Sequence, residues 1–221
     1  MKKEESHMNS FLVLGLGRFG RHIAKKLVEQ DNEVLAVDIK EDRVNASLRF
    51  VTDAQIGDCT DPDFIESLGI NNFDMVIVAI GDNFQASLET TALVKEKGAK
   101  HVFARANRDI HKKFLLRNGA DSVIYPERET AERIAVKLGS NHILDYFRLD
   151  DDYSIYEITV PRSWEGKTIL EKNVRQKYNI SIIAIKDNDR FMPIFSPNHV
   201  FEKNQTLLVM GDEESVMKIT K

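Results

Sequence analysis

The stretch FLVLGLGRFG, residues 11–20, decides the fold of this chain. Four apolar residues lead into Gly15, and Gly17 and Gly20 complete the pattern G-x-G-x-x-G. The first glycine permits a tight turn, the second lets the backbone approach a pyrophosphate, and the third lets a helix pack closely on the strand. An amphipathic run over residues 21–30 follows. The stretch therefore predicts a strand, a glycine turn and a helix whose N-terminus faces an anion.

A carboxylate stands at the expected distance from this turn. Asp38 lies at the end of an apolar segment, 18 residues after Gly20. An acid in this position is typical of a side chain that binds a ribose hydroxyl in a dinucleotide fold. The strand, the helix and the acid together favour a nucleotide-binding Rossmann unit. The alternative is a glycine turn that only packs a helix on a strand.

Composition limits the class of protein. The 221 residues are 42% hydrophobic and 30% charged, and the net charge of −4 does not favour nucleic acid as a partner. Apolar runs such as residues 75–80 are far shorter than the roughly 18 residues that span a bilayer. The first ten residues are polar, without a signal-peptide core. Cys59 is the only cysteine, which excludes an intrachain disulfide and suits a cytoplasmic protein.

The first two thirds of the chain alternate strands with helix-length segments. Six apolar strands end near Gly15, Ile39, Gly57, Ile80, Arg105 and Tyr125. Such alternation predicts the α/β class, as a Rossmann-like doubly wound parallel sheet. A longer segment, residues 130–147, is predicted as two helices that meet at a bend. They would dock on a partner subunit or connect two lobes, and the alternative is an ordinary packed terminal helix.

An acidic run at residues 149–152 then changes the composition. We expect a disordered or tag-like N-terminus at residues 1–10, a nucleotide-binding domain at residues 11–148 and a small α+β domain at residues 149–221. The small domain has a marginal core of its own, so we expect it to dimerise.

Ligands of doubly wound sheets bind beyond the carboxyl ends of the strands. Arg18 would add a bidentate phosphate donor to the glycine turn, which suits ADP or ATP, whereas the alternative is a solvated arginine. Asp58 is open between a ligand contact and a turn, and Asp61 is expected to cap a helix. The candidate nucleotide-binding residues are Gly15, Gly17, Arg18, Phe19, Gly20, Asp38, Asp58, Cys59, Ile80, Gly81, Asn83 and Arg105.

Several motifs resemble one family in order and spacing. They are GLGRFG at residues 15–20, AVD at 36–38, VIVAIG at 76–81, GAD at 119–121, YPE at 125–127, VRQKY at 174–178 and AIK at 184–186. They resemble the RCK proteins, which are cytoplasmic regulatory subunits of Ktr/Trk-type bacterial potassium transporters, and they look closest to the Ktr subgroup. The resemblance covers nearly the whole chain from Phe11.

The resemblance implies a regulatory protein and not an enzyme. It implies a dimer-based ring, an octamer, at the inner face of the membrane beneath a membrane-embedded potassium transporter. ATP and ADP would compete at the Rossmann site, with Arg18 and Arg105 on the phosphates and Asp38 on the ribose. Glu127 resembles an acid that holds a divalent cation, Mg²⁺ or Ca²⁺, together with ATP.

The resemblance also implies a cyclic di-AMP pocket in the small domain, with Ile169, Leu170, Arg175, Ile182 and Pro197 as candidate residues. Ser181 and Lys167 depart from that pattern. The competing hypothesis is an NAD(H)-dependent oxidoreductase or an NAD(H)-sensing regulator, because Asp38 suits any unphosphorylated ribose.

Overall fold

A computed structural model describes residues 9–220. These residues form two compact units, residues 9–127 and residues 128–220. The expectation for residues 1–10 lies almost entirely outside the described residues. No helix formed by residues 9–220 combines the length and the hydropathy that crossing a bilayer requires.

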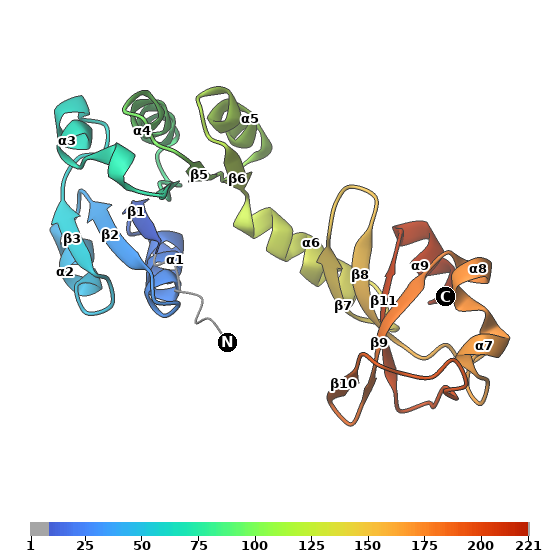
Figure 1. The fold of residues 1–221 in the computed structure, drawn as a ribbon. Coiled ribbons are helices and arrows are strands. Elements are labelled where there is room, and N and C mark those ends of the chain that lie inside the picture. The colour runs from blue at the N-terminus through green and yellow to red at the C-terminus, as the bar shows by residue number, and fades with distance from the viewer. Residues whose placement is uncertain (1–8, 221) are drawn as a thin grey trace. The chain divides into compact units, whose positions relative to one another are not determined.

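The first unit is a parallel six-stranded sheet flanked by helices (Figure 1). The strand order is β3-β2-β1-β4-β5-β6, so the first strand pairs with both β2 and β4 and the strand order reverses there. The strands are β1 (Ser10–Leu14), β2 (Glu33–Asp38), β3 (Asp53–Ile56), β4 (Met75–Val78), β5 (Val102–Arg105) and β6 (Ser122–Ile124). The predicted doubly wound α/β fold is confirmed.

Alternate residues of β1 enter two different cores. Leu12 and Leu14 pack in one cluster and Val13 packs in another, and all three are fully buried. Successive side chains of a strand point to opposite faces, so both faces of the sheet are covered. The covering helices are α1 (Arg18–Val28), α2 (Glu41–Ser47), α3 (Pro62–Ser67), α4 (Phe84–Glu96) and α5 (Asp109–Arg117), with a short 3₁₀ helix, η1 (Ile70–Asn72).

The second unit is built on an antiparallel sheet of order β10-β9-β11-β8-β7. Its strands are β7 (Ile143–Arg148), β8 (Ser154–Thr159), β9 (Ser181–Asp187), β10 (Arg190–Met192) and β11 (Thr206–Gly211). Its helices are α7 (Ile169–Lys172), α8 (Val174–Tyr178) and α9 (Glu213–Ile219). Trp164 and Phe201 are the largest fully buried side chains of its core, and their ring centroids lie 5.3 Å apart. The predicted small α+β unit is confirmed.

The predicted helix pair over residues 130–147 is wrong in its second half. Helix α6 (Pro126–Leu138) ends before Gly139, and the remainder is strand β7, which pairs with β8 in the second sheet. The chain divides between residues 127 and 128, whereas the sequence suggested 148/149. Pairing with β8 supplies the backbone hydrogen bonds of residues 143–148, and no local pattern in the sequence reveals that partner.

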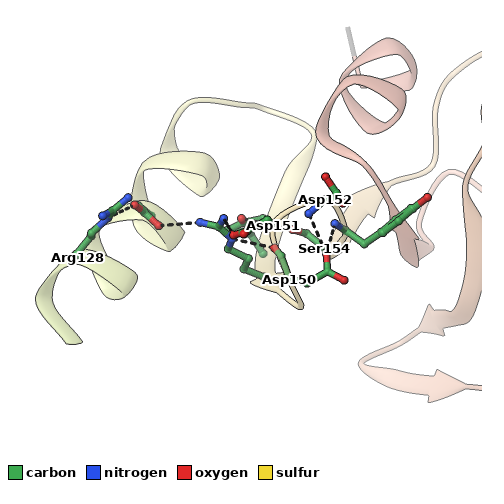
Figure 2. Close-up of polar contacts among 9 residues, drawn as sticks. Arg128, Asp150, Asp151, Asp152 and Ser154 are labelled. Atoms are coloured by element: carbon green, nitrogen blue, oxygen red, sulfur yellow. Dashed lines mark hydrogen bonds and ion pairs between the residues drawn. The ribbon is translucent and has the colours of Figure 1, made fainter. Parts of the chain in front are cut away.

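The acidic run, which we expected to separate the domains, is the turn of the β7–β8 hairpin. One carboxylate oxygen of Asp150 accepts hydrogen bonds from the backbone N–H groups of Asp152, at 2.9 Å, and Tyr153, at 2.7 Å (Figure 2). Arg148 donates to the carbonyl of Asp150 at 2.9 Å and to the carboxylate of Asp151 at 2.6 Å. Aspartate thus organises a tight turn by bonding to its own backbone.

Gly20 fixes the distance between α1 and the end of β1. A Cβ at Gly20 would lie 1.8 Å from the carbonyl oxygen of Gly15, which is backbone and cannot yield as a flexible side chain can. At Gly17, by contrast, a Cβ would meet no atom of the described residues within 4 Å apart from its chain neighbours, and the φ of −62° suits any residue.

We therefore expect Gly20→Ala to lower the free energy of unfolding of the first unit by about 2 kcal/mol or more, as overpacking does. Gly17→Ala, the matched control, should change it by less than about 1 kcal/mol. Urea unfolding followed by circular dichroism measures both. Equal stability of the two variants would contradict the close-packing role of Gly20.

Candidate functional site

A cavity of about 660 Å³ opens at the carboxyl ends of the strands of the first unit. Its lining includes every predicted nucleotide-binding residue except one: Gly15, Gly17, Arg18, Phe19, Asp38, Asp58, Cys59, Ile80, Gly81, Asn83, Arg105 and Glu127. The exception is Gly20, which is buried in the contact between α1 and β1. The residues at the carboxyl ends of the strands therefore lie together around one cavity, as predicted from the sequence.

The glycine turn presents the start of α1 to this cavity. Gly15 has a φ of +100°, a conformation that glycine adopts without strain, and its N–H donates to the carbonyl of Val37 at 2.7 Å. Gly17 caps α1 without a side-chain hydrogen bond, and the first turn of the helix carries no acidic residue. The first N–H groups of α1 are therefore available to an anion, and nothing in that turn offsets their positive partial charge.

Asp38 ties the glycine turn to the end of β2. One of its oxygens accepts from the N–H of Leu16 at 2.7 Å and pairs with Nη1 of Arg43 at 3.2 Å. The other accepts from the N–H of Lys40 at 2.9 Å. With a 4% exposed side chain, Asp38 stays hydrogen-bonded inside the site and keeps an acceptor position on the second oxygen for a ribose hydroxyl.

Arg105, at the end of β5, is held in place from three sides. Its guanidinium pairs with the carboxylate of Glu127 and lies 5.9 Å from the centre of the Phe19 ring. A Cβ at Gly81 would lie 2.0 Å from Nη1 of Arg105, so any larger residue there would make this guanidinium shift. Its Nε is buried and has no hydrogen-bond partner in the described structure. A buried guanidinium N–H without an acceptor is costly, and an anion in the cavity would relieve that cost.

Glu127 is ionised at neutral pH. Burial raises the pKa of its carboxyl, but the hydrogen bond from its own backbone and the guanidinium of Arg105 outweigh burial, and the charge of Arg18 adds to them, so the pKa lies below the ordinary glutamate value. The positive charge of Arg18 therefore lies near enough to Glu127 to stabilise its carboxylate. Across residues 9–220, no hydrogen bond or ion pair engages the Arg18 side chain.

Cys59 lines the cavity as a protonated thiol. Burial and the nearby charges of Asp38 and Asp58 raise its pKa to about 12. The thiolate is the nucleophilic form of cysteine, so this buried side chain is inert.

Hydrogen bonds in the structure show what Asp58, Asp61 and Asn83 do at the ends of their strands. Asp58 accepts from both the N–H and the hydroxyl of Thr60, at 2.9 and 2.8 Å, so one of its oxygens forms a turn. Asp61 caps α3 by accepting from the N–H of Asp63 at 3.0 Å, as predicted. Asn83 lines the cavity and caps α4 through the N–H of Ala86 at 3.1 Å.

Three residues near Asp38 also line the cavity, although the sequence did not predict them: Ile39, Lys40 and Arg43. Ile39 is 61% exposed beside the buried Asp38 and presents an apolar surface to the cavity. Arg43 reaches Asp38 from α2, five residues further on. The sequence shows a cation in the first turn of the helix that follows Asp38, but it does not show which carboxylate that cation pairs with.

The five candidate residues for cyclic di-AMP lie in the second unit. Ile169 and Leu170 begin α7 and are joined to residues 197–199, because the N–H of Leu170 donates to the carbonyl of Pro197 at 2.9 Å. Arg175 lies on α8 and Ile182 on β9. The structure thus brings Ile169, Leu170 and Pro197 together.

Comparisons with known proteins identify the class. The TrkA-N domain model matches residues 11–126 and the TrkA-C domain model matches residues 154–221. The "Ktr system potassium uptake protein C" of Bacillus subtilis is 41% identical over 221 residues, which cover 100% of this chain and 97% of that protein. The "Ktr system potassium uptake protein A" of Vibrio alginolyticus is 31% identical, covering 93% of this chain and 94% of that protein.

Solved structures show the same fold. The GsuK channel bound to NAD superposes with a TM-score of 0.69 at 17% identity, over 98% of this chain and 40% of that chain. The TrkA-N domain of the Escherichia coli inner membrane protein YbaL gives 0.53 at 24% identity, over 60% and 98%. The chain is thus a two-domain RCK protein, with a TrkA-N and a TrkA-C domain. Within that class it belongs to the Ktr regulatory subunits of potassium uptake.

Proposed function

We propose that the chain is a nucleotide-gated regulatory subunit that binds ATP and ADP in the cavity of the first unit and controls a membrane-embedded potassium transporter. The supporting observation is a cavity in which a fixed arginine with an unsatisfied buried N–H and an unpaired arginine accompany an open helix N-terminus. Arg105 and Arg18 supply the donors that a phosphate chain needs.

The ribose side of the cavity suits an unphosphorylated adenosine. Asp38 would accept a ribose hydroxyl, and the exposed apolar side chain of Ile39 would contact the base. NAD(H) shares that half of the molecule, so it competes in the same experiment. The ionisable side chains of the lining are arginine, lysine, carboxylates and a protonated thiol, without a histidine, and we propose no catalytic role for them.

A ligand shifts the equilibrium between two conformations of a protein only through its different affinity for them. ATP and ADP differ by one phosphoryl group, so the contacts that discriminate between them must lie where the third phosphate of ATP binds. Glu127 pairs with Arg105 and would also be the acid that holds Mg²⁺ or Ca²⁺. Within residues 9–220, no three or more His, Cys, Asp and Glu side chains gather to hold a metal ion. A cation at Glu127 would therefore need phosphate oxygens as further ligands, which ties it to ATP.

The proposal also states how copies of the chain assemble and where the assembly lies in the cell. Helix α6 has no buried residue, and Ile134 and Leu138 on it are 49% and 80% exposed. We propose that they are covered in a dimer-based ring, an octamer, held at the inner face of the membrane by the transporter. Cyclic di-AMP binding between two small domains, at Ile169, Leu170, Arg175, Ile182 and Pro197, is part of this proposal.

Arg18→Ala should weaken ATP binding more than ADP binding, by about 1–3 kcal/mol for ATP, because a charge-assisted phosphate contact is lost. Arg21→Ala, on the same helix but outside the cavity lining, should leave both affinities unchanged. Isothermal titration with ATP, ADP and NADH measures the effect. Tight NADH binding without any adenine nucleotide binding would contradict the proposal.

Glu127→Gln should leave ADP affinity within about twofold and weaken the gain in ATP affinity that Mg²⁺ or Ca²⁺ provides, since the neutral amide oxygen lacks the negative charge with which the carboxylate attracts these cations. The control is Glu129→Gln, outside the cavity lining. Isothermal titrations with ATP, with and without the cation, measure this gain in affinity for each variant. A full cation effect in Glu127→Gln would show that this carboxylate only pairs with Arg105.

Leu138→Glu should weaken self-association, because it places a charge on an apolar surface that the oligomer would bury. The neighbouring change Lys137→Glu serves as the charge control. Light scattering of the full chain measures the mass of each. A monomeric wild-type chain, or equal masses for all three proteins, would contradict the assembly proposal.

A further inference from the structure

The second unit holds a cavity of its own, of about 570 Å³. It lies between the turn that follows β8, the last residues of α8 and α9, and the segment before β7, all within residues 128–220. The residues used below are Arg162, Lys218, His142, Thr159, Trp164 and Tyr178. Its volume falls within the range of small-molecule sites, about 300–1,000 Å³.

The charged side chains that line this cavity are all positive. Arg162 and Lys218 line it, and its lining contains no aspartate or glutamate, although the whole chain carries a net charge of −4. In the described part of the chain, Arg162 makes no hydrogen bond or ion pair. Lys218 pairs with Glu214 at 2.8 Å, but Glu214 lies outside the lining. A free guanidinium without a competing carboxylate is a ready partner for an anion.

The floor of the cavity offers further donors. Trp164 is 1% exposed, and neither its indole N–H nor the Tyr178 hydroxyl has a hydrogen-bond partner among residues 9–220. The two rings lie 5.2 Å apart. His142 uses Nδ1 in a contact of 2.9 Å with the Thr159 hydroxyl, which leaves its other ring nitrogen available. The indole N–H of Trp164 and the hydroxyl of Tyr178 therefore add two groups to this lining that can donate to an anion.

A simpler explanation is that the cations complement the negative C-terminal ends of α8 and α9, near which they lie. A long helix carries only about half a charge at its end, and these helices have five and seven residues. The Thr220 hydroxyl already bonds to the carbonyl of Val216 at 3.1 Å. Lys218 is already paired with Glu214, but the full charge of Arg162 has no such partner in the described structure and exceeds the partial charge of these short helix ends.

We propose that this cavity binds a small phosphorylated metabolite, with the guanidinium of Arg162 on the phosphate and Lys218 beside it. The planar guanidinium matches two phosphate oxygens at once. The site is separate from the nucleotide cavity of the first unit. None of the residues that the family resemblance assigns to cyclic di-AMP lines it. Arg175 of that set and Tyr178 share the short helix α8, so the two ligands would act on the same element.

Trp164 makes the site directly observable, because it is the only tryptophan of the chain. The full-length protein is titrated with pyrophosphate while tryptophan fluorescence is followed, and sodium chloride at matched ionic strength serves as the reference. A saturable change is expected with pyrophosphate and none with chloride. Arg162→Gln should raise the dissociation constant at least about tenfold, the effect of one lost charge-assisted contact.

Three control variants locate the response. Arg190→Gln, a cation of β10 outside the cavity, and Arg18→Ala, in the nucleotide cavity of the first unit, should give the same saturable change of Trp164 fluorescence with pyrophosphate as the wild type does. Arg175→Gln should also keep the wild-type fluorescence response, because Arg175 does not line this cavity. Because Arg162 is exposed, unliganded Arg162→Gln should keep the wild-type emission spectrum, which verifies its fold.

The inference is overturned if pyrophosphate gives no saturable change, or if Arg162→Gln responds as the wild type does. It is equally overturned if Arg175→Gln or Arg18→Ala removes the response, because the anion would then bind elsewhere. None of these outcomes depends on whether ATP or ADP binds in the first unit.

Discussion

The contact between Gly20 and the carbonyl oxygen of Gly15 is the constraint on which the first unit depends. A single added carbon would lie 1.8 Å from that oxygen, so α1 can meet β1 at this distance only through glycine. The close approach sets the turn between them, and the turn places the N–H of Leu16 on Asp38 at 2.7 Å. Strand β2, the helix N-terminus and the carboxylate of Asp38 are thereby fixed relative to one another. The nucleotide cavity is a consequence of that packing.

Carboxylates around this cavity hold two of its arginine side chains in place. The lining contains Arg18, Lys40, Arg43 and Arg105 against Asp38, Asp58, Asp82 and Glu127. Ion pairs hold Arg43 on Asp38 and Arg105 on Glu127, and a turn occupies one oxygen of Asp58. A fixed cation loses less side-chain entropy when a ligand binds. Arg18 has no ion pair among residues 9–220 and is free to move, which is why we propose Arg18 as the contact of the terminal phosphate.

Much of this arrangement could be predicted from the sequence, because glycine spacing and apolar runs are local signals. The succession of six parallel strands and the meeting of their carboxyl ends at one cavity followed from alternation alone. Arg43 could not be predicted in this way, since its partner is defined only when α2 folds back beside β2. The β7–β8 hairpin was missed because Ile143, Leu144 and Phe147 fit a helical spacing as well as a strand, and only pairing with β8 decides between them. The acidic run at residues 150–152 suggested a break in the chain, because nothing in its composition shows that its hydrogen bonds go to the backbone of its own turn.

Potassium uptake into vesicles tests the central claim most directly, that the nucleotide in the first unit regulates a transporter. The membrane subunit of the same uptake system is reconstituted with this chain, and flux is measured with saturating ATP, with saturating ADP and without nucleotide. The account predicts that flux with ATP differs from flux with ADP, and that the difference disappears when the chain is left out. Equal flux under ATP, ADP and no nucleotide, with the chain bound to the transporter, would contradict it.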